Sequence, residues 1–206
     1  MTTKIILVRH GHVEGIDPRR FRGREDIPLT PLGRSQANST AAVIAGIWQP
    51  ACVLASPMAR CVATATAISD ACGSPILPLE ALSEIDYGAW QWKTHDEIRR
   101  RFPDLYAQWL TAPHLFRFPC GESLQDLVAR AGDALRHILE QYRDRSVVVV
   151  SHNSVSRVLL MEVLDQPLSA YWRIHFSPCG ISEIEFAGDT PRVLRLNETF
   201  HLCGIA

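Results

Sequence analysis

The amino-acid sequence predicts an α/β protein with three layers, in which helices cover both faces of a mainly parallel, mixed β-sheet. Two observations lead to this prediction. Short apolar runs alternate along the chain with segments that carry apolar residues at helical spacing. In one of these runs, Val147–Val150, β-branched residues face both sides, which is typical of a central strand covered on both faces.

Five segments are expected to form strands, and four longer ones to form helices. The strands are expected at Ile5–Val8, Cys52–Ala55, Val147–Val150, Ile181–Phe186 and Val193–Leu196. The helices are expected at 30–48, 56–72, 122–142 and 154–164. Thr30 followed by Pro31 is typical of a helix N-terminus, and Ser56 followed by Pro57 repeats the pattern.

A chain of 206 residues is expected to form a single domain, 1–206, with a sizeable core. The segment at about 87–121 is the least regular and contains three prolines and three of the five tryptophans. We expect it to be a helical insertion that lies over one end of the sheet. Its tryptophans, Trp90, Trp92 and Trp109, fit either the roof of a pocket or the core.

Composition argues against several kinds of partner. The formal net charge is −1, so bulk electrostatics gives no reason to expect binding to nucleic acid or to a membrane. No run approaches the roughly 18 apolar residues of a membrane span, and the start MTTKIILVRHG does not resemble a signal peptide. The six cysteines are scattered without a CxxC pair, so we expect reduced thiols and a cytoplasmic protein. The apolar content of the surface does not distinguish a monomer from a homodimer, so a homodimer stays an open alternative.

Polar side chains follow three of the predicted strands, at the points where these strands end. They are Arg9-His10-Gly11, Ser56-Pro57 with Arg60, and Ser151-His152-Asn153. Ligands of open α/β sheets bind outside the carboxyl ends of the strands, so these groups are expected to converge. An arginine fork matches the oxygens of a phosphate, and a neutral imidazole nitrogen can attack phosphorus. The sequence therefore predicts a site for a phosphoryl group.

Motifs along nearly the whole chain support this interpretation. In order, they are LVRHG, DIPLTPLGRSQA, ASPMARCVATA, LSEIDYGAW, CGESLQDLVAR, VVVVSHNSVSR and LRLNETFHL. In this order and at this spacing, they resemble the histidine phosphatase superfamily, which has the phosphoglycerate-mutase-like fold.

The resemblance implies a role for five residues. His10 matches the nucleophile that becomes phosphohistidine, and Arg9, Arg60 and His152 match the residues that hold the phosphoryl oxygens. Glu84 matches the general acid that protonates the leaving oxygen and then activates water. Cations around the transferring group would supply most of the catalysis. A histidine beside arginines is also expected to have a lowered pKa, which leaves it neutral and nucleophilic.

The chain departs from the family pattern at several positions. Ile16 stands where relatives carry an asparagine that helps to bind phosphate, and Arg22 replaces a usual glutamine just before Gly23. Our hypothesis is that Arg22 takes over anion binding together with Gly23, and that Asn153 contacts phosphate through its backbone N–H. The arginine-rich loop 19–24, with Arg24 at its end, fits either the pocket mouth or a solvated loop balanced by acidic neighbours.

Two residues of the RHGH motif require separate interpretation. Gly11 is expected to let the chain turn away after His10. His12 forms an HxH pair with His10, which in barrel hydrolases binds metal, but such barrels need eight β/α units and a longer chain. The other histidines, His95 and His175 among them, are expected to be structural or exposed. Asp86 competes with Glu84 for the role of the acid.

The function predicted from the resemblance is a phosphomonoester hydrolase of the histidine acid-type, independent of metals and of cofactors, acting on a small phosphorylated metabolite. Two alternatives stay open. A phosphoglycerate mutase would use the same residues, and a non-catalytic member would only bind a phosphorylated ligand or a protein.

Overall fold

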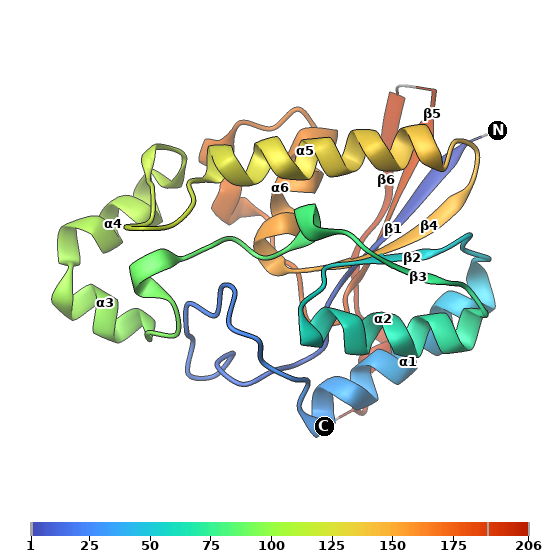
Figure 1. Cartoon of the computed structure of the whole chain (residues 1–206), viewed down its shortest axis with the longest axis horizontal. Coiled ribbons are helices and arrows are strands. Elements are labelled where there is room, and N and C mark those ends of the chain that lie inside the picture. Colours follow the sequence, from blue (N-terminus) through green and yellow to red (C-terminus); the bar gives the residue numbers. More distant parts are fainter. Residues whose placement is uncertain (1, 189, 206) are drawn as a thin grey trace.

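The computed structural model describes residues 2–188 and 190–205, which form a six-stranded sheet in the order β3-β2-β4-β1-β5-β6 (Figure 1). The strands are β1 (Thr3–Arg9), β2 (Val53–Ala55), β3 (Ile76–Pro78), β4 (Ser146–Ser151), β5 (Ile181–Ala187) and β6 (Thr190–Glu198). The first four strands run parallel, and β5 pairs antiparallel with both β1 and β6. The predicted mixed, mainly parallel sheet is therefore confirmed.

Helices cover both faces of this sheet, as predicted. In Figure 1, α5 (Leu124–Gln141) and α6 (Asn153–Val163) lie above it, and α1 (Pro31–Ile47) and α2 (Ala59–Cys72) lie below. Alternate residues of the central strands point to opposite sides. In β1, for example, Leu7 is buried in the core with α5 and α6, and Val8 is buried in the core with α1 and α2.

Two local predictions differ from the structure. The short strand β3 (Ile76–Pro78) was not expected, because two apolar residues between Pro75 and Pro78 give too short a run to predict a strand. The helix expected from Pro57 begins instead at Ala59, with Met58 as its N-cap residue. By contrast, Thr30 caps α1 as predicted, because its side chain accepts a hydrogen bond from the Gly33 N–H.

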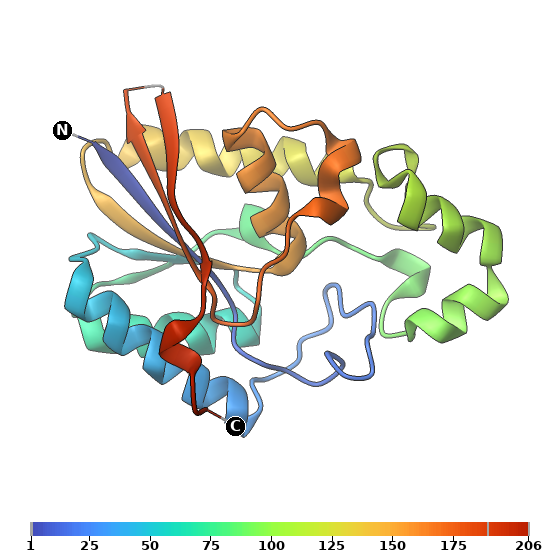
Figure 2. The same cartoon turned by 180° about the vertical axis from the view of Figure 1, so that it is seen from behind.

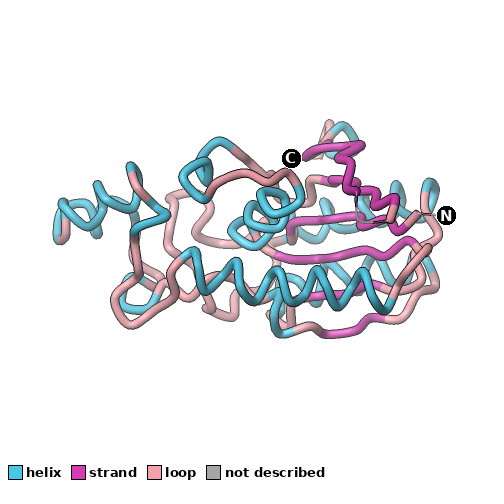
Figure 3. The backbone as a smooth tube through the Cα atoms, turned by 90° about the horizontal axis from the view of Figure 1, so that it is seen from above, coloured by secondary structure: helices cyan, strands magenta, loops and turns pink. Residues whose placement is uncertain are grey.

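The segment 87–121 contains α3 (His95–Arg101), α4 (Pro103–Thr111) and two short 3-10 turns. It lies at one end of the molecule, beyond the sheet, in both views of the cartoon and in the view from above (Figures 1, 2 and 3). Trp90 and Trp109 are buried against Phe118, with ring centroids 5.3 and 4.8 Å apart, and Trp92 is 38% exposed. The aromatic residues of the insertion thus extend the core that the sheet forms with α5 and α6.

The register of the parallel strands aligns three strand ends at one edge of the sheet. Arg9 of β1 pairs with Ser151 of β4, and Ala55 of β2 pairs with Val150 of β4. The residues that follow these strands therefore start from neighbouring positions, as predicted. Within the described ranges, no helix is long and apolar enough to cross a membrane.

Candidate active site

The five residues to which the motifs assign a role lie in one buried cluster. Arg9 ends β1 and His10 follows it, Arg60 is the second residue of α2, and His152 lies between β4 and α6. Glu84 follows a 3-10 turn at Glu80–Leu82. All five are at most 6% exposed. Polar groups buried to this degree have to be compensated by neighbours or by a ligand.

The backbone of the next residue, Gly11, sets the tautomer of His10. Its Nδ1 lies 2.7 Å from the carbonyl oxygen of Gly11, and since a carbonyl only accepts, Nδ1 carries the proton. The lone pair of Nε2 is then available. Burial, and next the charge of Arg60, hold the pKa of His10 well below its usual value of 6.5. The ring is therefore neutral at pH 7, as predicted, and can act as a nucleophile.

Arg60 and His152 form a hydrogen-bonded pair beside His10. Arg60 Nε donates to His152 Nδ1 over 3.2 Å, and the His152 ring lies 5.2 Å from that of His10, centroid to centroid. The Nε2 atom of His152 is 2.8 Å from the hydroxyl of Ser56, which therefore serves this histidine and does not cap α2. Burial lowers the pKa of His152 well below its usual value, with Arg60 as the next cause.

Loop carbonyls position the guanidinium of Arg60. Its Nη1 donates to the Glu25 oxygen and its Nη2 to the Gly23 oxygen, both at 2.7 Å. Gly23 thus contacts Arg60 through its carbonyl, and it does not line the cavity described below. A guanidinium has five N–H donors, so Arg60 can make these contacts and still donate to a ligand.

Arg9 and Arg22 add two more cations. Arg9 Nη1 donates to the Phe176 oxygen over 2.5 Å, and its buried Nε has no hydrogen-bond partner in the described part of the chain. Burial, and next the charge of Arg22, lower the pKa of Arg9 to about 9. Arg22 Nη1 donates to the Gly15 oxygen over 2.6 Å, and burial lowers its pKa too. Buried cations that destabilise one another are typical of an anion site.

The carboxylate of Glu84 lies among these arginines, since its charge raises the pKa of Arg9, Arg22 and Arg60. Its Oε1 accepts a hydrogen bond from the Ile85 N–H over 3.0 Å. Asp86, the competing acid, instead accepts from the Gly88 N–H over 2.8 Å. The structure therefore places Glu84, and not Asp86, within the cluster.

The N-terminus of α6 also faces the site. His152 occupies its N-cap position without a side-chain capping hydrogen bond, and Asn153 is the first helical residue. Uncapped N–H groups at a helix start favour an anion. Asn153 lines the cavity, and its buried Oδ1 has no partner among the described residues. At α2 the first N–H is taken, because Ala59 donates to the Asp26 carboxylate over 2.8 Å.

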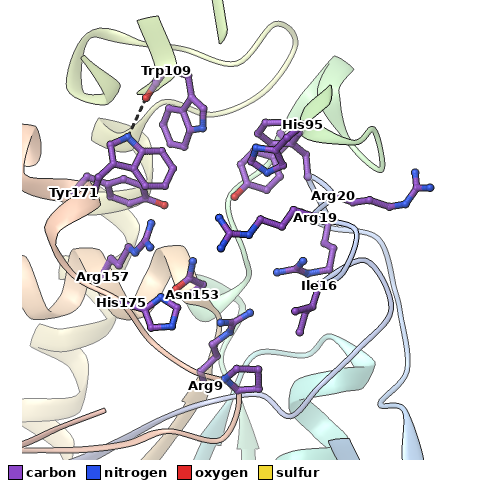
Figure 4. Close-up of a pocket in the computed structure, with 15 residues that line it drawn as sticks. Arg9, Ile16, Arg19, Arg20, His95, Trp109, Asn153, Arg157, Tyr171 and His175 are labelled. Carbon is purple, nitrogen blue, oxygen red and sulfur yellow. Dashed lines mark hydrogen bonds between the residues drawn. The ribbon is translucent and has the colours of Figure 1, made fainter. Parts of the chain in front are cut away.

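A cavity of about 310 Å³ adjoins this cluster at Arg9, whereas His10, Arg60, Glu84 and His152 are not among its lining residues (Figure 4). Its lining arginines and histidines are Arg9, Arg19, Arg20, Arg22, Arg157, His95 and His175, and the described lining contains no aspartate or glutamate. Three arginines of the loop 19–24 are among them, but Arg24 is not, since it forms an ion pair with Glu122 at 3.2 Å. Ile16 lines the cavity as well.

The sequence analysis missed one side of this cavity. Arg157, Tyr171, Trp172 and His175 line it, as does His95, and the two histidines were expected to be structural or exposed. Tyr171 and Trp172 belong to a 3-10 turn at Leu168–Arg173 whose sequence carries no motif. A signal existed for Arg157, because it follows Asn153 by four residues and so lies on the same face of α6.

Gly11 serves a different purpose from the predicted turn. It has no left-handed backbone conformation, but a Cβ at Gly11 would lie 2.5 Å from the carbonyl oxygen of Gly33. A Cβ at Gly33 would in turn lie 2.1 Å from the oxygen of His12. The two glycines let the chain after β1 pack against the start of α1, which holds His10 in place.

His12 does not act together with His10. Its Nδ1 lies 2.9 Å from the Thr30 hydroxyl, and its N–H donates to the Gln36 side chain. In the ranges that the structure describes, no three His, Cys, Asp or Glu side chains are grouped to hold a metal ion. Of the HxH pair, His10 thus belongs to the site, and His12 belongs to the contact with the start of α1.

The lowered pKa values predict how stability depends on pH. A histidine whose pKa is below 6.5 in the folded state binds its proton more readily in the unfolded state, so the free energy of unfolding falls as the pH drops below 6.5. We expect His10→Asn to reduce this loss of stability by about 1 kcal/mol between pH 6.5 and 5.5, and by about 1.4 kcal/mol per pH unit below that interval. Urea unfolding at several pH values, without phosphate, measures it. Equal slopes in both proteins would contradict the neutral His10.

Together, the fold and the site define an α/β protein with a buried cluster of arginines, histidines and a glutamate at the carboxyl ends of its parallel strands. Residues 5–199 match the histidine phosphatase superfamily (branch 1), and the chain belongs to this family. The family predicted from the motifs is therefore confirmed.

Similar proteins agree with this assignment. The structure of Bacillus stearothermophilus YhfR has a TM-score of 0.92 and 31% sequence identity, covering 97% of this chain and 99% of that one, which also confirms the phosphoglycerate-mutase-like fold. Phosphoserine phosphatase 1 of Hydrogenobacter thermophilus is 29% identical over 97% of this chain and 94% of its own length. Bifunctional protein Rv2228c of Mycobacterium tuberculosis is 32% identical over 97% of this chain and 55% of its own length. The chain thus spans about half the length of the first curated relatives it matches.

Proposed function

We propose that this protein hydrolyses a small phosphomonoester through a phosphohistidine on His10. The observation that carries the proposal is the environment of His10. A neutral imidazole with an available Nε2 lies beside two buried arginines, Arg9 and Arg60, whose pKa values are lowered chiefly by burial, and the half-buried Arg22 lowers the pKa of Arg9 further. A phosphoryl group would supply the negative charge that these arginines lack, and it would present its phosphorus to the nucleophile.

The reaction would proceed in two steps. In the first, Nε2 of His10 attacks phosphorus, the bond from phosphorus to the ester oxygen breaks, and Glu84 protonates the leaving oxygen. In the second, Glu84 takes a proton from a water molecule, the water oxygen attacks phosphorus, and the bond to Nε2 breaks to release phosphate. Arg9, Arg60 and the first N–H groups of α6 would stabilise the charge on the equatorial oxygens in both steps.

Similar proteins support a metabolite substrate. Phosphoserine phosphatase 1 is named for a small phosphorylated amino acid, and the alignment covers nearly all of its length. A cavity of about 310 Å³ suits a substrate of that size. We propose a small phosphorylated metabolite as the substrate class, and a mechanism that uses neither metal nor cofactor.

A panel of phosphomonoesters, assayed with and without excess EDTA, tests the proposal. We expect release of inorganic phosphate at rates that EDTA does not change, together with a phosphoenzyme that is stable to base and labile to acid, as a phosphoramidate is. Loss of activity in EDTA would contradict the metal-independent mechanism.

The same panel separates the alternatives. A phosphoglycerate mutase would move the phosphoryl group within 3-phosphoglycerate and release little phosphate. A non-catalytic member would form no phosphoenzyme and would leave every substrate intact. Either result would overturn the proposed hydrolysis.

A further inference from the structure

We propose that Arg157 forms a second anion subsite, and that the substrate is a phosphomonoester whose leaving group carries another anionic group, a carboxylate or a second phosphate. This inference rests on the proposed function, since it describes the other end of the same substrate.

The first observation is that Arg157 is buried without a partner. It is 6% exposed, and its Nε and Nη1 make no hydrogen bond with any described residue. A buried guanidinium is normally paired, because an unpaired buried charge costs several kcal/mol. In Figure 4 the side chain reaches into the cavity beside Tyr171, with Asn153 and His175 next to it. Arg157 therefore lines the cavity as a cation that no carboxylate of the described lining neutralises.

The second observation is that aromatic rings hold this guanidinium in place. The Arg157 Cζ lies 4.9 Å from the Tyr171 ring centroid and 5.0 Å from that of Trp172. Stacking on aromatic faces occupies the plane of a guanidinium and leaves its N–H edge available. Trp172 is itself held, since its Nε1 donates to the Trp109 oxygen over 3.1 Å. The arginine is thus oriented before any ligand arrives, which favours affinity.

The third observation is the distance from the phosphoryl site. Asn153 begins α6 beside the cluster around His10, and Arg157 follows one helical turn later. Four residues of α-helix rise about 6 Å. Side chains one helical turn apart lie on the same face, so Asn153 and Arg157 line the same cavity at neighbouring positions, with Arg157 farther along α6 from His10 in the chain.

The charge of the cavity supports a second anion. Five arginines line it, without aspartate or glutamate in the described lining. His175 also lines the cavity, and a histidine supplies no negative charge to Arg157, whether neutral or protonated. One phosphoryl group at the base would leave Arg157 unpaired.

Matched substrates test the subsite. 3-Phosphoglycerate and glycerol 3-phosphate differ at a carboxylate, and glucose 1,6-bisphosphate and glucose 6-phosphate differ at a second phosphate. We expect the wild-type enzyme to favour the more anionic member of at least one pair in kcat/KM. Arg157→Met keeps the length of the side chain and removes its charge, and it should lower that preference about 10- to 100-fold, mainly through KM. Arg157→Lys should restore part of it.

Arg173→Met is the matched control, because Arg173 is exposed on the same 3-10 turn and does not line the cavity. It should keep the wild-type preference. A preference confined to one pair identifies the second anion as carboxylate or phosphate. The subsite is overturned if the wild type prefers neither charged substrate, or if Arg157→Met lowers both members of a pair equally.

Binding separates this inference from the proposed function. Calorimetry on His10→Ala measures the affinity for the same pairs without turnover. If His10→Ala binds the more anionic member of a pair more tightly and His10→Ala/Arg157→Met does not, the subsite is supported even when no substrate is hydrolysed. Hydrolysis without any such preference would leave the proposed function intact and reject the subsite.

Discussion

Replacing His10 by alanine is expected to lower kcat/KM for p-nitrophenyl phosphate by about 10⁴-fold or more, because loss of a nucleophile removes the covalent route altogether. The remaining arginines would still bind phosphate, so KM should change far less than kcat. Steady-state kinetics measure both effects, and quenching in base, where a phosphoramidate is stable, traps the phosphoenzyme. No phosphohistidine should be detected in the variant.

The matched control is His137→Ala, because His137 is an exposed histidine of α5 outside the site. It should keep wild-type kinetics and the phosphoenzyme. Circular dichroism and thermal unfolding of both variants check that the fold is intact. A phosphoenzyme that persists in His10→Ala would show that another residue is the nucleophile.

Glu84→Gln is expected to have the second largest effect, and its size should depend on the leaving group. General-acid help is worth about 10²- to 10⁴-fold when the leaving oxygen is an alkoxide, and much less for p-nitrophenolate, which leaves without a proton. We therefore expect a loss in that range for alkyl phosphates and a small loss in phosphoenzyme formation from p-nitrophenyl phosphate. Rates across a series of leaving groups give a steeper dependence on leaving-group pKa in the variant.

The second step offers an independent readout. If Glu84 also activates water, the phosphoenzyme of Glu84→Gln should accumulate after a burst of p-nitrophenol. The control is Asp86→Asn, since Asp86 only accepts from the Gly88 N–H and should not change the leaving-group dependence. An equal loss for all leaving groups in Glu84→Gln would assign this residue to structure instead of proton transfer.

Much of this protein could be predicted from its sequence, because the informative residues stand at strand ends. Arg9, His10 and His152 directly follow apolar runs, and parallel strands in register bring such ends together. Helix starts were equally readable at Thr30, where capping chemistry is local. At Ser56 the same pattern failed, since its hydroxyl lies within hydrogen-bonding distance of His152, 96 residues away in sequence.

The rest depended on contacts that no local pattern encodes. Arg22 and Arg24 are two residues apart in one loop, but one lines the cavity and the other pairs with Glu122. Position 11 requires a glycine because the backbone of Gly33 approaches it closely, and not because of the backbone angles at position 11.

The sequence by itself determined the chemistry of the base of the site, an imidazole with arginines at the ends of parallel strands. Only the tertiary structure decided what surrounds it. The packing of α6 against the turn at Leu168–Arg173 buries Arg157 beside two aromatic rings and leaves its Nε and Nη1 without a hydrogen-bond partner among the described residues. Burial turns an ordinary helix arginine into a candidate for substrate selection, because a desolvated charge requires a partner and an exposed one does not.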